Sequence, residues 1–267
     1  AYTQTRKAFE IAYEYQIPAI VLYDQKLGGE LMNVPASVFD EEPNPSLGAT
    51  LTEAELEDAP HDESGKFSRF QHDVDDGVSP RSIPGQKGGH FLATGNEHTP
   101  EGHIAESPEN RVAQMDRREQ KLDAIHEDLA TQDDTHQAHH GPDEATYGLM
   151  TFGSSQGTVE EAVDRLNDQG YSVKSLGVSD MAPYPVEEVT EFIESVDEVL
   201  VVEMNASAQF RGLTQKELGR FGEKMTSLLK YNGNPFEHHE IVEGFETSIN
   251  GGDLDSETTK FVPAAGD

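Results

Sequence analysis

The sequence predicts an α/β protein whose carboxyl-terminal half is a doubly wound, mostly parallel sheet with helices on both faces. From Tyr147 onwards, short apolar runs alternate at least four times with stretches of helical periodicity, the order that builds such a sheet. A helical stretch followed by an apolar run also opens the chain, so α/β structure is expected there too.

The opening segment is typical of the end of an α/β unit. Apolar residues between Ala8 and Tyr15 recur at the spacing of one helix face, and Pro18 ends that helix. The run Ala19–Asp24 then predicts a buried parallel strand. The sequence before it holds no neighbours for such a strand and no initiator Met, so we expect a fragment or a processed product.

Residues 34–142 predict a long irregular connection that contains one helix. The apolar spacing of Arg111–Leu129 predicts that helix, with a dense charged face. Leu51–Ala59 fits a loop or a short helix, and Phe67–Phe70 and His90–Ala93 fit short strands. Residues 131–144 predict an acidic linker that contains histidines.

The regular half contains four strands, each followed by a helix. Thr158 and Glu161 predict a capping box at the start of the first helix, and Gly170 is at its carboxyl-terminal cap position. Pro185 predicts the first turn of the next helix. The predicted strands are Tyr147–Phe152, Tyr171–Val178, Glu198–Asn205 and Ser227–Tyr231. The predicted helices run from Thr158 to Gly170, from Pro185 to Val196, from Gln209 to Phe221 and from Glu237 to Ile249.

The charge balance favours a folded protein of a salt-rich cytoplasm. Fifty-one acidic residues against nineteen basic ones give a net charge of −32, and only 34% of the residues are hydrophobic, below the usual value of about 45–50%. Disorder is the other interpretation of such a composition. We favour the folded one because the acids lie on the polar faces of clear helix patterns, and because multimolar salt reduces the screening length to about 3 Å.

The composition also excludes several classes of function. Nucleic acid is a poor partner, because phosphate binding needs clustered Lys and Arg. Without cysteine the chain has no disulfides, no thiol nucleophile and no Cys-ligated iron–sulfur cluster. No apolar run approaches the roughly 20 residues that span a bilayer, and the amino terminus does not have the pattern of a signal peptide. A soluble, cytoplasmic protein is therefore expected.

Two motifs could bind an anion or a metal ion. The loop Gly153–Gly157 joins a strand to a helix, where backbone amides can hold a phosphate or carboxylate, but its glycine spacing fits an ordinary turn better. His136 and His140 would share one face of a helix, with His139 beside them, as zinc ligands can. A solvated polar linker is the preferred interpretation of these histidines, and we predict no metal site.

Three further residues are candidate contacts with substrate or with a partner subunit. Arg81 lies in the loop Gly77–Gly85, whose prolines and glycines fix the backbone, so its guanidinium could face a carboxylate. The alternative is that Arg81 anchors this loop to its own domain. Glu203 and Asn205 end the third strand of the regular half, where open α/β sheets bind ligands, and capping is the alternative role. No catalytic residue is identified.

Several separated motifs together resemble the alpha subunit of 2-oxoacid:ferredoxin oxidoreductases. VLVVEMNASAQFRGLTQKEL and SLLKYNGNPFEHHEI resemble its carboxyl-terminal domain, which is similar to that of transketolase. FSRFQHDVDDGVSPRSIPG, GNEHTPEGHIAE and RVAQMDRREQKL resemble its middle region, and AFEIAYEYQIPAIVLYDQKLG resembles the end of its pyrimidine-binding domain. The resemblance divides the chain into residues 1–33, 34–142 and 143–267, and the loop GVSPRSIPG favours the 2-oxoglutarate branch.

The resemblance implies oxidative decarboxylation of a 2-oxoacid to an acyl-coenzyme A, with electrons passing to ferredoxin. It implies thiamine diphosphate, magnesium and an iron–sulfur cluster in the whole complex, bound mainly by a beta subunit and none by this chain alone. The chain has no Tyr-Pro-Ile-Thr-Pro segment and no Gly-Asp-Gly…Asn motif, so the principal catalytic residues of the family cannot be assigned to it. A non-catalytic acidic interaction module and a component of another thiamine-dependent enzyme are the alternatives.

Overall fold

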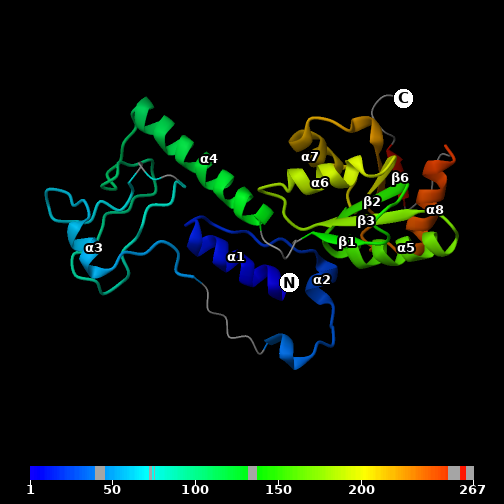
Figure 1. The fold of residues 1–267 in the computed structure, drawn as a ribbon, viewed down its shortest axis with the longest axis horizontal. Helices are drawn as coiled ribbons and strands as arrows, with labels where there is room; N and C mark the ends of the chain where they lie inside the picture. The colour runs from blue at the N-terminus through cyan, green and yellow to red at the C-terminus, as the bar shows by residue number, and fades with distance from the viewer. Residues whose placement is uncertain (40–45, 72–73, 75, 132–136, 252–258, 263–267) are drawn as a thin grey trace. The chain divides into compact units, whose positions relative to one another are not determined.

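The chain forms two compact units, which are described separately. The computed structural model describes residues 1–39, 46–71, 74, 76–131, 137–251 and 259–262. The first unit comprises residues 1–22 and 32–131, and the second comprises residues 23–31 together with residues from 132 onwards. Figure 1 shows that the strands of the sheet all belong to the second unit.

The second unit is built on one six-stranded sheet. Its strand order is β1-β3-β2-β4-β5-β6, and the four inner strands β2 to β5 are parallel. The two edge strands, β1 and β6, run antiparallel to their neighbours. The strands are β1 (Ala138–His140), β2 (Tyr147–Phe152), β3 (Val173–Val178), β4 (Glu198–Glu203), β5 (Met225–Lys230) and β6 (Thr259–Val262). The predicted doubly wound, mostly parallel α/β fold is therefore confirmed.

Two pairs of helices cover the two faces of this sheet. One pair is α5 (Gln156–Asp168) and α8 (His238–Ile249), and the other is α6 (Val186–Glu194) and α7 (Gln209–Leu218). The short elements of this unit are α2 (Gln25–Gly29) and the 3-10 turns η2 (Gly153–Ser155) and η3 (Gly222–Lys224). All four predicted helices are present, although their ends differ by a few residues.

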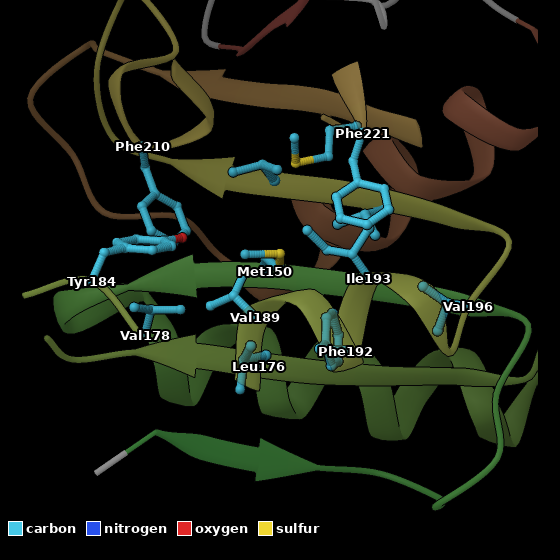
Figure 2. Close-up of a cluster of buried hydrophobic side chains, with 13 residues drawn as sticks. Met150, Leu176, Val178, Tyr184, Val189, Phe192, Ile193, Val196, Phe210 and Phe221 are labelled. Carbon is cyan, nitrogen blue, oxygen red and sulfur yellow. The ribbon is translucent and has the colours of Figure 1, made fainter. Parts of the chain in front are cut away.

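Each face of the sheet has its own hydrophobic core. On the α6–α7 side, Phe192, Ile193 and Phe210 pack against strand residues such as Met150 and Leu176, as Figure 2 shows. On the α5–α8 side, the predicted inner stripe of α5 is fully buried against the strands. That stripe consists of Val159, Ala162, Val163 and Leu166.

The start of α5 differs from its prediction. The helix begins at Gln156, two residues before the predicted cap Thr158, and no side chain caps it. The predicted capping box of Thr158 and Glu161 is therefore wrong, because the 3-10 turn η2 leads directly into the helix. At the other end, Gly170 has φ +93°, a left-handed conformation that glycine adopts without a steric penalty.

The first unit consists of helices joined by long irregular segments. Its elements are α1 (Tyr2–Glu14), the 3-10 turn η1 (Ala36–Phe39), α3 (Glu53–Asp58) and α4 (Pro108–Thr131). The first and last of these helices confirm the sequence prediction, and α3 begins with a capping box between Thr52 and Glu55. No helix among the described residues is long and apolar enough to cross a membrane.

The short strands predicted in the first unit do not form. Phe67 forms an isolated bridge with His61, and the amides of Phe67, Ser68 and Phe70 donate to three separate segments, at the carbonyls of His90, Pro60 and Pro100, so no continuous ladder forms among these described residues. Turns of Gly, Pro and Asp between these segments leave too few consecutive residues for a ladder.

The predicted strand Ala19–Asp24 is also absent from the structure. These residues have no regular secondary structure, and the side chains of Ile20 and Leu22 are 80% and 81% exposed. A parallel strand needs hydrogen-bonding neighbours on both edges and apolar cover on both faces, and the described residues supply neither. The prediction of a buried strand is therefore wrong for this chain alone.

The predicted acidic linker contains a strand instead. Residues 138–140 form β1, which pairs with β3 from Ala138↔Gly177 to His140↔Ser175. Short strands with polar side chains are typical of sheet edges, because charge there discourages pairing with another chain. Residues 132–136, which include His136, lie outside the described residues.

Gly148 in β2 gives a test of this packing. A Cβ atom on Gly148 would lie 2.9 Å from the ring of Phe192, whereas one on Gly157 in α5 would have no neighbour within 4 Å. We expect Gly148→Val to lower the free energy of unfolding by about 1–3 kcal/mol through overpacking. Gly157→Ala, as the control, should leave it unchanged or raise it by about 0.5–1 kcal/mol. Denaturant unfolding in high salt measures both, and equal stability of the two variants would contradict this packing.

Candidate functional site

The carboxyl edge of the sheet is the first candidate site. Strands β3 and β4 lie on opposite sides of β2 in the sheet. The chain runs from β2 to β3 and then crosses back to β4, so the direction of winding reverses between β2 and β4. Open α/β sheets bind their ligands outside the carboxyl ends of the strands at such a point. Gly153–Ser155 follows β2 there, and Glu203 and Asn205 lie at the end of β4.

Glu203 caps helix α7. Its carboxylate is only 1% exposed and accepts hydrogen bonds from the backbone amides of Phe210 at 2.7 Å and Arg211 at 3.3 Å, both in the first turn. Ser227 Oγ on the adjacent strand lies 3.5 Å from the same carboxylate. A negative charge at a helix amino terminus satisfies otherwise unpaired amides and interacts favourably with the helix dipole. The capping role considered from the sequence therefore accounts for Glu203.

Asn205 supports this arrangement from the loop that follows β4. Its Nδ2 donates to Glu203 at 2.6 Å, and its Oδ1 accepts from the amides of Ser207 at 3.1 Å and Gln209 at 3.2 Å. Asn205 thus fixes both the carboxylate of Glu203 and the turn that leads to α7. Contact of Glu203 and Asn205 with a substrate or with another subunit stays a prediction.

The loop Gly153–Gly157 does hold a carboxylate, and that carboxylate belongs to the chain itself. Ser154 donates its hydroxyl to the carboxylate of Asp24. Burial alone would raise the pKa of Asp24, but the hydrogen bonds from Leu27 and Ser154 outweigh it and hold the pKa below its ordinary value. The loop therefore has the predicted chemistry, but an internal partner supplies the anion.

A buried ion pair closes the carboxyl end of β5. Lys230 Nζ lies 2.7 Å and 2.6 Å from the two carboxylate oxygens of Glu240 and donates to the Pro235 carbonyl at 2.9 Å, while its side chain is 5% exposed. Burial would raise the pKa of Glu240, but Lys230 and the amide of Glu237 lower it below its ordinary value. Every proton of the lysine ammonium therefore has an acceptor.

The histidines of β1 point to opposite faces of the sheet. His139 Nε2 lies 2.6 Å from Glu188 on α6, and His140 Nε2 lies 2.8 Å from Asp164 on α5. Successive residues of a strand alternate between faces, so these two imidazoles cannot share a metal ion. Among the residues that the structure describes, no group of three His, Cys, Asp or Glu side chains could hold a metal.

The loop around Arg81 is the second candidate site, and it lies in the first unit. Its centre is Ser79, which is fully buried. Arg117 donates to the Gly77 carbonyl at 2.8 Å and to Ser79 Oγ at 2.9 Å. Arg69 donates to the Ser79 carbonyl at 2.9 Å and also to Gln16 Oε1. Two buried guanidiniums therefore fix the backbone that precedes Arg81.

A third cation joins this cluster. Lys121 is 9% exposed, and its Nζ lies 3.4 Å from the Gln16 carbonyl. Burial, followed by the charges of Arg117 and Arg69, lowers the pKa of Lys121 to about 8. Burial and the neighbouring cations likewise lower the pKa of Arg69 to about 10. The first unit therefore concentrates positive charge beside this loop in a chain that is strongly negative overall.

Arg81 itself is anchored within its own unit. Its Nη2 donates to the Leu47 carbonyl at 2.8 Å, and its guanidinium lies 5.5 Å from the centre of the Tyr13 ring. Its backbone pairs with that of Thr50. This is the anchoring role that the sequence left open, while contact with a carboxylate substrate stays a prediction.

The sequence did not identify Asp24, Lys230 or the buried cations as important residues. Their partners lie far away in the chain, as with Asp24 and Ser154, which are 130 residues apart. One signal was present for Asp24, because a charged residue directly after an apolar run often lies at the carboxyl end of a strand.

Comparison with known sequences gives one consistent assignment. Residues 145–240 match the family described as pyruvate:ferredoxin oxidoreductase core domain II. Subunit alpha of 2-oxoacid:ferredoxin oxidoreductase 2 from Aeropyrum pernix is 30% identical over 242 residues, which cover 91% of this chain and 35% of the relative. Subunit alpha of 2-oxoacid:ferredoxin oxidoreductase 1 from Sulfurisphaera tokodaii is 27% identical over 248 residues, or 92% of this chain and 36% of the relative. The chain thus spans about a third of the length of these relatives.

A solved structure supports the same assignment. The 2-oxoglutarate:ferredoxin oxidoreductase from Magnetococcus marinus, with 2-oxoglutarate, coenzyme A and succinyl-CoA bound, matches with a TM-score of 0.71 and 26% identity. The match covers 89% of this chain and 38% of that one. The resemblance inferred from the sequence motifs is therefore confirmed.

The capping role of Glu203 can be tested by removing its charge. Glu203→Gln keeps the shape but directs a donor group at the amides of Phe210 and Arg211. We expect the free energy of unfolding to fall by about 1–3 kcal/mol. Glu223→Gln, at an exposed position of the same unit, is the control and should have little effect. Equal effects of the two substitutions in denaturant unfolding would contradict the capping role.

The pair of Lys230 and Glu240 predicts a dependence of stability on pH. Because the folded state lowers the pKa of Glu240, the pair stabilises the fold above the ordinary carboxyl pKa of about 4.3. That contribution is lost as the pH falls through the lowered pKa. We therefore expect Glu240→Gln to flatten the acid limb of the curve of unfolding free energy against pH. The exposed Glu243→Gln should retain the slope of the original chain, and an unchanged slope in Glu240→Gln would refute the prediction.

Proposed function

We propose that this chain supplies the carboxyl-terminal part of the alpha subunit of a 2-oxoacid:ferredoxin oxidoreductase. The premise is its relation to such subunits over 91% of its length. The observation that carries the proposal is the joint agreement of sequence and fold across both units, with a TM-score of 0.71 over 89% of the chain. The activity proposed for the whole enzyme is oxidative decarboxylation of a 2-oxoacid, with electrons passing to ferredoxin and the acyl group to coenzyme A.

The predicted division into residues 1–33, 34–142 and 143–267 forms part of this proposal. Residues 1–33 are then the end of a pyrimidine-binding domain, and residues 19–24 are one of its inner strands. The exposure of Ile20 and Leu22 supports this, because apolar side chains on a run of this kind are normally covered. The last part, residues 143–267, includes the segment that matches core domain II.

The proposed substrate is 2-oxoglutarate. Two observations support this choice: the loop GVSPRSIPG and the similarity to the Magnetococcus marinus enzyme, which was solved with 2-oxoglutarate and succinyl-CoA bound. Pyruvate and branched 2-oxoacids are the competing substrates. The two types of substrate differ in charge, since 2-oxoglutarate carries a second carboxylate.

The proposed partners are a beta subunit and ferredoxin. Thiamine diphosphate, magnesium and an iron–sulfur cluster belong to the proposed complex, with the beta subunit as their main binding partner. The chain has no cysteine to ligate an iron–sulfur cluster, and among its described residues no group of three His, Cys, Asp or Glu side chains could hold a metal ion. No step of the reaction is therefore assigned to a cofactor bound here.

The proposed contribution of this chain is positional. Arg81 is proposed as a contact to the substrate carboxylate or to the partner subunit, and the nearby cations Arg69, Arg117 and Lys121 favour an anion at that place. Glu203 and Asn205 are proposed to shape the surface at the carboxyl edge of the sheet. The net charge of −32 supports a salt-rich cytoplasm as the setting.

Co-purification from the native host tests the proposed function. The intact gene product carrying an affinity tag is recovered in multimolar salt and assayed for 2-oxoacid-dependent reduction of ferredoxin or a viologen dye. We expect a cysteine-containing, thiamine-binding subunit in the eluate, with higher kcat/KM for 2-oxoglutarate than for pyruvate. An inactive protein that elutes alone would refute the proposal and favour an interaction module. Thiamine-dependent activity without electron transfer to the dye would favour another thiamine enzyme.

The role of Arg81 is tested in the same intact enzyme. Arg81→Lys keeps the charge but loses the paired donors that suit a carboxylate. We expect KM for the 2-oxoacid to rise about ten- to a hundredfold while KM for coenzyme A stays unchanged. Lys87→Gln, at an exposed position after the same loop, is the control. If KM for the 2-oxoacid is unchanged and only the stability falls, Arg81 does not contact the substrate and serves only to anchor the loop within its own unit.

A further inference from the structure

The carboxyl end of β2 is the position where a sheet of this topology holds a ligand, and here part of the chain covers it. Ser154 follows β2 directly, at the point where the winding of the sheet reverses. Asp24 accepts a hydrogen bond from the Ser154 hydroxyl. This contact lies within the second unit, to which residues 23–31 belong.

One carboxylate joins the beginnings of two helical segments. Asp24 Oδ1 accepts from the Leu27 amide at 3.0 Å and so caps α2, while Oδ2 accepts from Ser154 in the turn that leads into α5. The Asp24 carbonyl also accepts from the Gly28 amide at 3.0 Å. Charge-assisted hydrogen bonds of this kind are about twice as strong as neutral ones.

Apolar packing contributes little to the attachment of this segment. Helix α2 has no buried side chain, and the side chains of Tyr23, Leu27 and Leu31 are 68%, 40% and 98% exposed. A five-residue helix is too short to be stable by itself in water. The carboxylate of Asp24 is therefore the main described feature that can hold residues 23–31 on the α/β unit.

We propose that Asp24 is an intramolecular latch, which holds residues 23–31 over the carboxyl end of β2 and couples the order of α2 to the Ser154 turn. While the latch is closed, the hydroxyl of Ser154 is occupied by a partner from within the chain. Opening the latch frees the segment and exposes this edge of the sheet. The inference does not depend on the proposed enzyme activity, because it concerns contacts inside one unit.

The decisive experiment is hydrogen–deuterium exchange of the intact gene product in multimolar salt, with peptides that cover residues 24–31 and 152–160. Ser154→Ala alters only the α5 side of the contact. If the latch exists, exchange in residues 24–31 should rise at least about tenfold, although this variant changes no residue of α2. Ser207→Ala, in the β4–α7 loop, is the matched control and should leave α2 unchanged. Unchanged exchange of α2 in Ser154→Ala would overturn the proposal, because Asp24 would then cap its own helix only.

A second variant separates the two roles of Asp24. Asparagine remains a good cap for a helix, but it has one acceptor oxygen, so it cannot accept from Leu27 on one oxygen and from Ser154 on the other. Asp24→Asn should therefore speed exchange in residues 152–160 about tenfold. Exchange in β3 and β4 should stay slow and report that the fold is intact. If residues 152–160 exchange at the original rate in Asp24→Asn, the latch does not exist.

Discussion

Burial of the parallel strands on both faces is the constraint on which the α/β unit depends. Strands β2 to β5 contribute alternate side chains to two separate cores, and each core is closed by one helix pair. Parallel strands need such two-sided cover, so the helices that connect the strands must be divided between the two faces. Because helices cover both faces, only the strand ends and their loops are available to a ligand. The candidate site is therefore at the carboxyl ends of the strands.

At that edge, charged side chains mainly hold the protein's own backbone and its own ion pairs. Glu203 accepts from two amides of α7, and Asp24 accepts from an amide of α2 and from the hydroxyl of Ser154. Lys230 pairs with Glu240. The buried arginines of the first unit likewise donate to loop carbonyls. These charged side chains therefore stabilise the fold of the chain, which is compatible with the proposed role as part of a larger subunit.

The regular half could be predicted from the sequence because its signals are local. The periodicity of α5 and the short apolar runs of β2 to β5 depend on neighbouring residues, and these elements are confirmed. The contacts of Asp24 with Ser154 and of Arg117 with Ser79 join residues far apart in the chain, so no pattern in the sequence reports them. The apolar run Ala19–Asp24 shows a third case: its composition indicates that it is suited to burial, but not which residues would cover it.

That uncovered run offers the most direct test of the account. An electron cryo-microscopy structure of the intact gene product with its co-purifying partner would locate residues 19–24. The account predicts that they form a parallel strand between two others, with Ile20 and Leu22 buried. If they remain unpaired and exposed to solvent in the intact assembly, this chain is not the continuation of an α/β domain, and its assignment as part of an oxidoreductase alpha subunit loses its structural basis.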